Sequence, residues 1–485
     1  MTSDQDLAAG PVRAAPAAVA VPAPNPSRTR LTALIVAFAL LMQNLDSTVV
    51  ATALPAMARS FGADPLQMNL ALTSYLLALA VFIPVSGWMA DRFGSRTVFR
   101  AAIAVFTLGS VLCGQSVSLP MLVVSRIVQG LGGAMMVPVG RLLMLRSVAK
   151  SELVAAMAWL TTPALIGPVI GPPLGGLLAT YANWRWIFTI NIPIGLLGTI
   201  LVTRYVQEVR EAAPGRLDWV GLLLSGAALS GLMFGAEMVG RSVVPPGVIA
   251  ACMGAGLVAG WAYVRHARAR PDPLLDLSLL RVPTFAVSVL AGSLFRVGVG
   301  AIPFLLPMLI QLGFGRSAAE SGMITFASAI GAIAMKPAAQ SALRWFGFRT
   351  TLFWNAAASA AGVAVCAAFR PWWPLPALYG VLIGAGFLRS LQFTAYNTIA
   401  YADIPRPRMS AATSLYSTIQ QLSLTFGITV GAGTLALTSA IHGEVGVADF
   451  SVAFLVVAAI MLAAAPASLL MPADAGAEMS GHKHR

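Results

Sequence analysis

A single carboxylate interrupts a long apolar stretch near the N-terminus. The stretch is AFALLMQNLDSTVVATALP, residues 37–55, and it contains Asp46. A carboxylate inside a lipid-embedded run costs several kcal/mol unless a partner or a function justifies it. Arg126 interrupts a second such run, SRIVQGLGGAMMVPVG, residues 125–140, and we expect it at a similar depth in the same half of the molecule. The two residues are therefore a candidate buried pair.

Three kinds of chemistry are open to Asp46. Burial favours the protonated carboxyl, whereas a neighbouring Arg126 favours the carboxylate. Such a pair could release a proton on one side of a membrane and take one up on the other as its exposure alternates. The pair could instead be a purely structural link between two helices, or Asp46 could bind a cation directly.

Three more cations lie inside apolar segments where an aliphatic residue would be expected. They are Arg296 in SLFRVGVG, Lys336 in AIAMKPAA and Arg389 in GFLRSLQF, and we find no matching acidic residues in those segments. Each costs about 2.5–3.5 kcal/mol if it is unpaired at the bilayer centre. A cavity lined by such cations would suit an anion. The structural alternative is that Lys336 extends toward the interface and Arg389 bonds helix carbonyls.

Polar side chains within the apolar segments are the candidates for binding a substrate. Amide side chains in a membrane more commonly bridge helices than bind ligands, so that role stays open for them. The candidate substrate-binding residues are Gln43, Asp46, Arg126, Arg296, Lys336, Arg389, Asn397 and Gln420.

The elements that must position these residues are membrane-spanning helices. The chain has 485 residues, of which 58% are hydrophobic and 10% are charged, whereas soluble proteins carry about 25% charged residues. Apolar runs of about 20 residues recur along the sequence, which is typical of spanning helices and differs from the short alternating strands of a membrane barrel. We therefore expect an all-α polytopic protein with the lipid bilayer as its surroundings.

The apolar runs predict 14 spans with both termini on one side of the membrane. Arginine and lysine favour one set of connecting loops over the other by roughly three to one, which predicts that this set and both termini are cytoplasmic. The same bias accounts for the net charge of +13 without a nucleic-acid partner. The expected spans are 31–54, 68–89, 98–117, 120–143, 153–179, 185–203, 218–238, 247–264, 284–311, 320–342, 350–369, 375–399, 410–438 and 450–471.

An internal repeat divides the chain into two halves. ADRFGSRT, residues 90–97, follows the second expected span, and LRWFGFRT, residues 343–350, follows the tenth. Repeated halves around a central site are a common plan of transporters. The expected units are a disordered cytoplasmic tail 1–30, a six-helix bundle 31–203, a two-helix insert 204–282, a second six-helix bundle 283–471 and a cytoplasmic tail 472–485.

Two glycine-containing motifs predict contacts that open and close. GWMADRFGSR, residues 87–96, has glycines that allow close helix approach and a tight turn, and charges that can pair across an interface. GPVIGPPLGG, residues 167–176, predicts a kinked helix with a smooth packing face. The gating candidates are Gly87, Asp91, Arg92, Gly94 and Arg96, and the second motif contributes Gly167, Pro168, Gly171, Pro172, Gly175 and Gly176.

Together these stretches resemble the major facilitator superfamily, in particular its 14-span drug:H⁺ antiporter family 2. Residues 87–96 match motif A of that superfamily, residues 126–133 match motif B, and residues 167–176 resemble the antiporter motif of exporters. The segments GGAMMVPVGRL and WRWIFTINIPIG are similar to the MdtD-like branch of multidrug-resistance proteins. Motif A departs from the family pattern at Ser95, where the family commonly has a basic residue.

The resemblance implies a function as well as a fold. It implies two six-helix bundles with two extra central helices, and a proton-coupled multidrug efflux transporter that works by alternating access. Asp46 and Arg126 would couple protons to a small-molecule substrate, with the proton gradient in place of a cofactor. It further implies a location in the bacterial inner membrane. The sequence does not determine the oligomeric state, and a monomer is the expectation. The alternative that the embedded cations favour is an exporter of anionic metabolites such as citrate or iron–citrate.

The sequence does not predict an enzyme. It contains no H-E-x-x-H zinc motif, no G-x-S-x-G nucleophile motif and no phosphate-binding loop, which also argues against ATP hydrolysis within the chain. The three cysteines, Cys113, Cys252 and Cys366, each lie in an expected span without metal-ligand spacing, so we expect no metal site.

Overall fold

The computed structural model describes residues 26–62, 68–148, 152–208, 215–238, 244–442 and 445–482. All regular secondary structure in these ranges is helical, which confirms the expected all-α fold class. Ten of the described helices are long and apolar enough to cross a membrane, or eleven if the bent pair Glu320–Ala334 and Lys336–Cys366 forms one span. The total of 14 spans stays a prediction.

The helices follow the order in which the sequence predicts them. The first half contains α1 Pro26–Phe61, α2 Asn69–Phe82, η1 Ile83–Val85, α3 Ser86–Phe93, α4 Ser95–Gly114, α5 Leu119–Ser147, α6 Leu153–Tyr181, α7 Trp186–Thr189 and α8 Asn191–Tyr205. The insert contains α9 Trp219–Met238 and α10 Pro246–Ala269. The second half contains η3 Leu277–Arg281, α11 Pro283–Met308, η4 Leu309–Gly313, α12 Ala318–Ala334, α13 Lys336–Cys366, α14 Leu375–Ile399, η5 Arg406–Arg408, α15 Met409–His442, α16 Val447–Leu462, α17 Ala464–Ser468 and α18 Ala477–Ser480.

The FG-x-RT repeat forms the same backbone feature in both halves. Gly94 separates α3 from α4 with φ 93°. Gly347 interrupts α13 with φ 70°, so that two helices meet there. Positive φ angles favour glycine because it has no Cβ. The repeat therefore encodes a sharp helix-to-helix turn at equivalent places.

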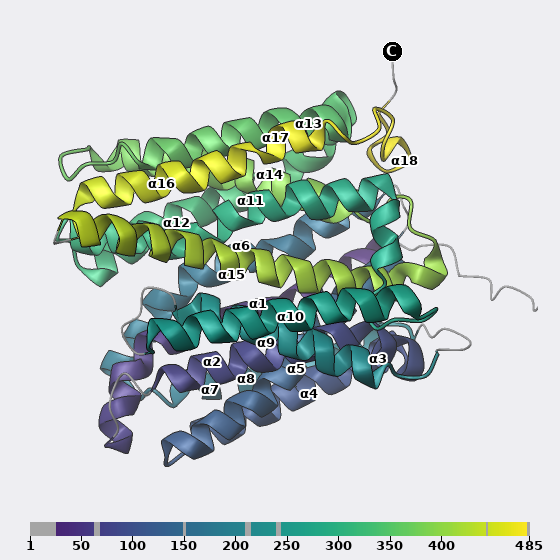
Figure 1. The fold of residues 1–485 in the computed structure, drawn as a ribbon, viewed down its shortest axis with the longest axis horizontal. Coiled ribbons are helices and arrows are strands. Elements are labelled where there is room, and N and C mark those ends of the chain that lie inside the picture. Colours follow the sequence, from purple (N-terminus) through teal and green to yellow (C-terminus); the bar gives the residue numbers. More distant parts are fainter. Residues whose placement is uncertain are drawn as a thin grey trace, which may run out of the picture.

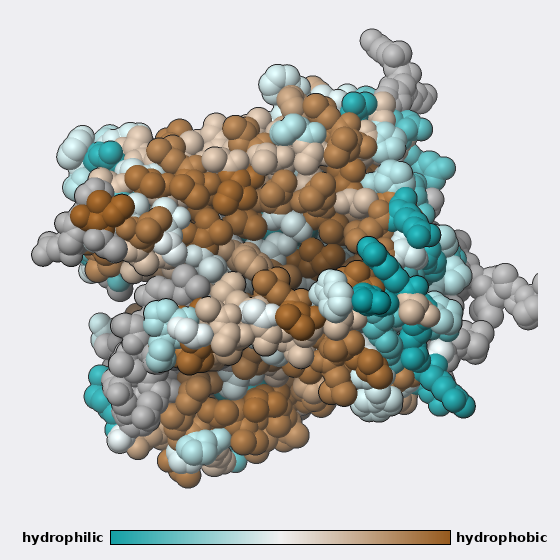
Figure 2. Space-filling model, in the orientation of Figure 1, coloured by the Kyte–Doolittle hydropathy of each residue, from teal (hydrophilic) through white to brown (hydrophobic). Residues whose placement is uncertain are grey.

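Helices of both halves run side by side in one bundle (Figure 1). Helix α9 of the insert packs against α2 of the first half and α15 of the second half. Strongly hydrophilic residues gather at the end of the bundle where α3 and α18 lie, whereas the flank of the helices is largely hydrophobic (Figure 2). We call this end the basic end. It is defined by the α3–α4 turn with Arg92 and Arg96, by the segment that leaves α10 with Arg268 and Arg270, and by α18.

Asp218 holds the insert at the basic end. It precedes α9 and accepts hydrogen bonds from the Gly221 amide at 2.9 Å, from His266 at 2.9 Å and from the Leu274 amide at 3.3 Å. Burial by itself would raise the pKa of Asp218, but these hydrogen bonds leave it below the ordinary value of 3.8. The carboxylate therefore ties together the two ends of the insert.

The described residues next to both termini are helical in part. Helix α1 begins at Pro26, inside the tail expected over 1–30, and residues 1–25 lie outside the described residues. The C-terminal segment forms the short helix α18, and His482 contacts the carbonyl of Arg344 at 2.9 Å. Met479 is buried, so this segment packs on the bundle.

Candidate functional site

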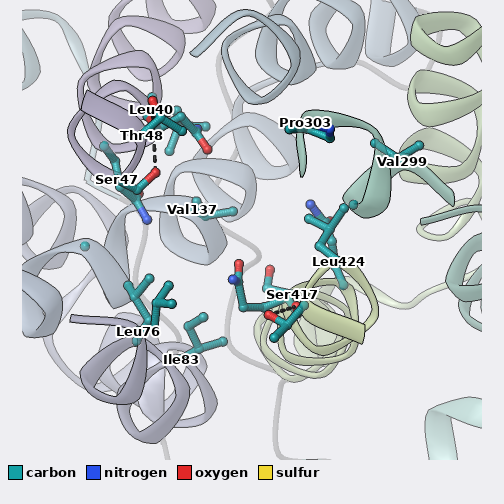
Figure 3. Close-up of a pocket in the computed structure, with 18 of the residues that line it drawn as sticks. Leu40, Ser47, Thr48, Leu76, Ile83, Val137, Val299, Pro303, Ser417 and Leu424 are labelled. Carbon is teal, nitrogen blue, oxygen red and sulfur yellow. Dashed lines mark hydrogen bonds between the residues drawn. The ribbon is translucent and has the colours of Figure 1, made fainter. Parts of the chain in front are cut away.

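A cavity of about 290 Å³ lies between the two halves (Figure 3). Leu40, Thr48 and Val137 reach it from the first half, and Pro303 and Leu424 reach it from the second half. Its other lining residues are Gln43, Asn44, Ser47, Tyr75, Leu76, Leu79, Ile83, Gly133, Arg141, Leu160, Val299, Gly300, Phe393, Ser417, Gln420, Gln421, Thr425 and Ile428. About half of the lining residues have apolar side chains, and all of the polar ones except Arg141 are uncharged.

The structure brings Asp46 and Arg126 together as a buried ion pair. Arg126 Nη1 lies 2.7 Å from Asp46 Oδ2, and both side chains are fully shielded from solvent. The Arg126 Nε donates to the carbonyl of Ala71 at 3.1 Å. The predicted link between the first and fourth spans, α1 and α5, is therefore present.

Three neutral side chains complete this pair, and the sequence analysis did not assign them a role. Gln129 Nε2 and Asn191 Nδ2 each donate to Asp46 Oδ1 at 2.9 Å. Both amides also contact the Ser110 hydroxyl, at 2.7 Å and 3.2 Å. The carboxylate therefore accepts one charge-assisted hydrogen bond and two hydrogen bonds from amides.

Tyr75 connects the ion pair with the cavity. Its ring lies under the Arg126 guanidinium, with 4.3 Å from the guanidinium carbon to the ring centroid. Tyr75 also lines the cavity, as does Gln43 on α1, whereas neither Asp46 nor Arg126 does. Tyr75 therefore contacts both the charged pair and the space available to a ligand.

The antiporter-like motif makes close contact between α6 and α1. A Cβ on Gly167 would lie 2.7 Å from the Asn44 side chain, and one on Gly171 would lie 1.9 Å from Thr48 Oγ1. The Thr48 hydroxyl donates to the Gly167 carbonyl at 3.2 Å. The small residues thus allow α6 to touch the helix that carries Asp46. Pro168, Pro172 and Gly176 lie within α6, where the structure does not describe their side-chain positions, and Gly175 is buried.

The motif A loop ties α3 to α5 and to α15 at the basic end. Asp91 accepts from Arg146 at 2.9 Å and from the Ser410 hydroxyl. The Gly87 amide donates to the Ser414 hydroxyl at 2.8 Å. Because Ser410 and Ser414 belong to the second half, these bonds close the two halves against each other at this end.

Glu208, which is not among the gating residues predicted from the sequence, fixes the rest of the loop. Glu208 accepts from the amides of Arg96 and Thr97 at 3.0 Å and 3.1 Å, so it caps the start of α4. A Cβ on Gly94 would lie 2.4 Å from the Glu208 carboxylate. Arg92 is exposed.

The embedded cations of the second half do not form the basic cavity that the sequence suggests. Arg296 is buried and donates to Tyr416, with its guanidinium over the Phe393 ring. Arg389 donates to the Ser328 hydroxyl at 3.3 Å. Lys336 lies at the bend between α12 and α13, 3.5 Å from the centroid of the Trp159 ring.

Asn397 is also placed away from the cavity, because its amide bonds the carbonyl of Phe393 one turn earlier. Of the eight predicted substrate-binding residues, only Gln43 and Gln420 line the cavity. The helical period fixes the face of each helix, but a single sequence does not tell which neighbour that face meets. The alternative hypothesis, an exporter of citrate or iron–citrate, is therefore not favoured.

Comparison with known proteins decides the family. The model of the Major Facilitator Superfamily matches residues 36–428. The chain belongs to this superfamily. It is 38% identical over 427 residues to the "Putative multidrug resistance protein MdtD" of Salmonella typhimurium, covering 86% of this chain and 88% of that protein. The protein of the same name from Salmonella typhi is also 38% identical over 427 residues.

Solved structures of the superfamily share the fold. The human organic anion transporter MFSD10 matches with a TM-score of 0.67 at 14% identity, over 91% of this chain and 99% of that one. A double-tryptophan variant of XylE matches with a TM-score of 0.65 at 16% identity, over 94% and 99%. The expected superfamily fold is thus confirmed, and the chain is a multi-pass membrane protein of a transporter family.

Proposed function

We propose that this chain is a proton-coupled exporter of small molecules that works by alternating access between two halves of the bundle. The observation that carries the proposal is the buried pair of Asp46 and Arg126 at 2.7 Å. It lies behind the wall of a cavity between the halves. The similarity to the multidrug resistance proteins named above supports efflux as the direction of transport.

The ionised pair stabilises the conformation that the structure shows. Removing one partner of a buried pair typically costs about 3–5 kcal/mol, because the other charge stays behind without compensation. Protonation of Asp46 removes its charge in the same way. It also turns an oxygen that accepts from Arg126, or from Gln129 and Asn191, into a donor. Proton uptake therefore favours a different arrangement of these residues.

The closed basic end supplies the second state-dependent contact. The bonds from Ser410 to Asp91 and from Gly87 to Ser414 join α15 to α3. They must break if the cavity is to open toward that end. A change at Asp46 reaches them through α5, because α5 carries both Arg126 and the Arg146 that bonds Asp91. Two states with different exposure of Asp46 would couple protons to substrate movement.

The positive-inside bias supports a cytoplasmic location for the basic end and for both termini. We further propose that the protein acts in the bacterial inner membrane as a monomer and uses the proton gradient without a cofactor. Its non-protein partners would be a small-molecule substrate, protons and the lipid bilayer. No catalytic step is part of this proposal.

Everted membrane vesicles that hold a respiratory pH gradient test the proposal. Added lipophilic compounds are scored by whether they dissipate the gradient through the wild-type protein. We expect Asp46→Asn to abolish this response while the protein is still produced and inserted. Glu320→Gln is the matched control, since Glu320 is an exposed carboxylate that pairs with Arg316 at 3.1 Å. Gradient dissipation by Asp46→Asn equal to wild type would contradict proton coupling at this residue.

A further inference from the structure

Arg141 is the one arginine or lysine that lines the described cavity. It lies on α5 and is only 4% exposed. Its Nη2 donates to Gln420 at 2.9 Å, and its Nη1 donates to Tyr401 and Ser417 at 3.3 Å each. The guanidinium also lies over the Tyr416 ring, 5.2 Å from its centroid. Arg141 thus reaches from the first half to the second.

All of these partners are uncharged. Within the described part of the chain, no carboxylate lies within 4.0 Å of Arg141, in contrast to Arg126 and Arg146, which have Asp46 and Asp91. The Arg141 Nε makes no hydrogen bond to any described residue. A buried cation without a counter-charge is costly, so the structure retains a positive group at the cavity whose charge no described carboxylate balances.

The other walls of the cavity restrict the kind of anion that would balance it. Leu40, Leu76, Ile83, Val299 and Leu424 are apolar, and the remaining polar groups are mainly amides and hydroxyls. A multiply charged metabolite would leave charges against these apolar walls. A molecule with one acidic group and an apolar body would match both parts of the cavity.

We propose that Arg141 binds the anionic group of the transported substrate, and that the substrates include lipophilic monocarboxylates. This inference rests on the proposed transport function and specifies its substrate class. The carboxylate replaces the neutral acceptors Ser417 and Gln420 with charge-assisted hydrogen bonds, which are about twice as strong. The apolar body of the substrate then lies against the aliphatic side chains of α1, α2 and α11.

Arg141 also links the two halves, so the test must distinguish this structural role from substrate binding. A residue that only joins the halves would affect all ligands equally. A residue that binds the anionic group would change the preference between an acid and its neutral isostere. The test therefore measures a ratio of affinities rather than a single affinity.

Equilibrium binding to the purified full-length protein, without any pH gradient, measures this ratio. The probes share a naphthalene body and carry a carboxylate, a primary amide or an ammonium group: 1-naphthylacetate, 1-naphthylacetamide and 1-naphthylmethylammonium. We expect the wild type to bind the carboxylate about tenfold more tightly than the amide, since a hydrogen bond to a charged group is stronger by about 1–1.5 kcal/mol. The ammonium should bind most weakly.

The variants assign the preference to one residue. Arg141→Gln should bind carboxylate and amide equally, with the amide affinity kept as evidence of an intact fold, and Arg141→Lys should retain part of the preference. Lys336→Gln removes a cation outside the cavity and should behave as wild type. The proposal is overturned if the wild type does not bind the acid, if it prefers the ammonium, or if Arg141→Gln keeps the preference. The binding assay uses no pH gradient. If the protein prefers the acid in this assay but the vesicle assay shows no proton movement, the proposed antiport is refuted and the proposed role of Arg141 is not.

Discussion

Gly171→Ala tests whether close contact between α6 and α1 is required for the fold and for transport. An added Cβ would lie 1.9 Å from Thr48 Oγ1 and 2.6 Å from Thr48 Cβ. Normal contact requires about 3.4–4 Å, so the two helices must separate or Thr48 must rotate. Either response breaks the 3.2 Å hydrogen bond from Thr48 to the Gly167 carbonyl.

The expected destabilisation follows from these two effects. Overpacking a close contact costs typically about 1–3 kcal/mol, and a lost hydrogen bond costs about 0.5–1.5 kcal/mol. The free energy of unfolding should therefore fall by about 1.5–4.5 kcal/mol. Three free cysteines, of which Cys113 and Cys366 are buried, allow a thermal assay in detergent with a thiol-reactive dye that reports their exposure.

Two further variants separate the clash from a general effect of the substitution. Gly254→Ala places its Cβ in open space on α10 and should be neutral or stabilising by up to about 1 kcal/mol, since alanine has the higher helix propensity. Thr48→Gly removes the clashing atoms, so it should restore stability to Gly171→Ala in the double variant. If Gly171→Ala melts at the wild-type temperature and still transports, close contact between α6 and α1 is not required for stability or for transport.

Three further predictions concern the basic end. Glu208→Gln should lower stability by about 0.5–1 kcal/mol, because an exposed carboxylate that caps the first turn of α4 is lost; thermal melting at low and high salt measures it. Asp91→Asn weakens bonds from Arg146 and Ser410, so a cysteine-labelling assay should find the basic end more accessible, and unchanged accessibility would contradict the gating role. The pKa of Asp218 lies below 3.8, so its contribution to stability is complete above about pH 4 and is lost as the pH falls through the lower, folded-state value. Asp218→Asn should therefore remove this part of the acid dependence of the melting temperature. An unchanged pH profile would argue against a stabilising role of the Asp218 carboxylate.

The sequence predicts the architecture well because its signals are local. Apolar runs of sufficient length mark the helices, and the FG-x-RT repeat marks equivalent turns, which the positive φ angles of Gly94 and Gly347 show. The pairing of Asp46 with Arg126 was also accessible, since both are expensive to bury alone and similar in depth. None of these inferences requires knowledge of how the two halves meet.

The composition of the cavity depends on how the two halves meet, and no local signal encodes that. Arg141 lies near a cytoplasmic span end in the sequence, where a positive-inside charge is expected, so nothing marked it as a cavity residue. Arg296 and Arg389 have the same residue type but face tyrosine and serine away from the cavity. Asn191 follows an aromatic segment and has no spacing that relates it to Asp46, although it lies 2.9 Å from that carboxylate.

Direct measurement of proton release tests the central claim, the coupling of Asp46 to substrate. Purified protein in weakly buffered detergent is mixed with a compound that dissipates the vesicle gradient, and a pH indicator counts the protons released per bound molecule. The account predicts about one proton per bound molecule for the wild type, because substrate and proton favour different arrangements of the Asp46–Arg126 pair, and none for Asp46→Asn. Equal proton release by both proteins would contradict the account and leave the pair a structural element.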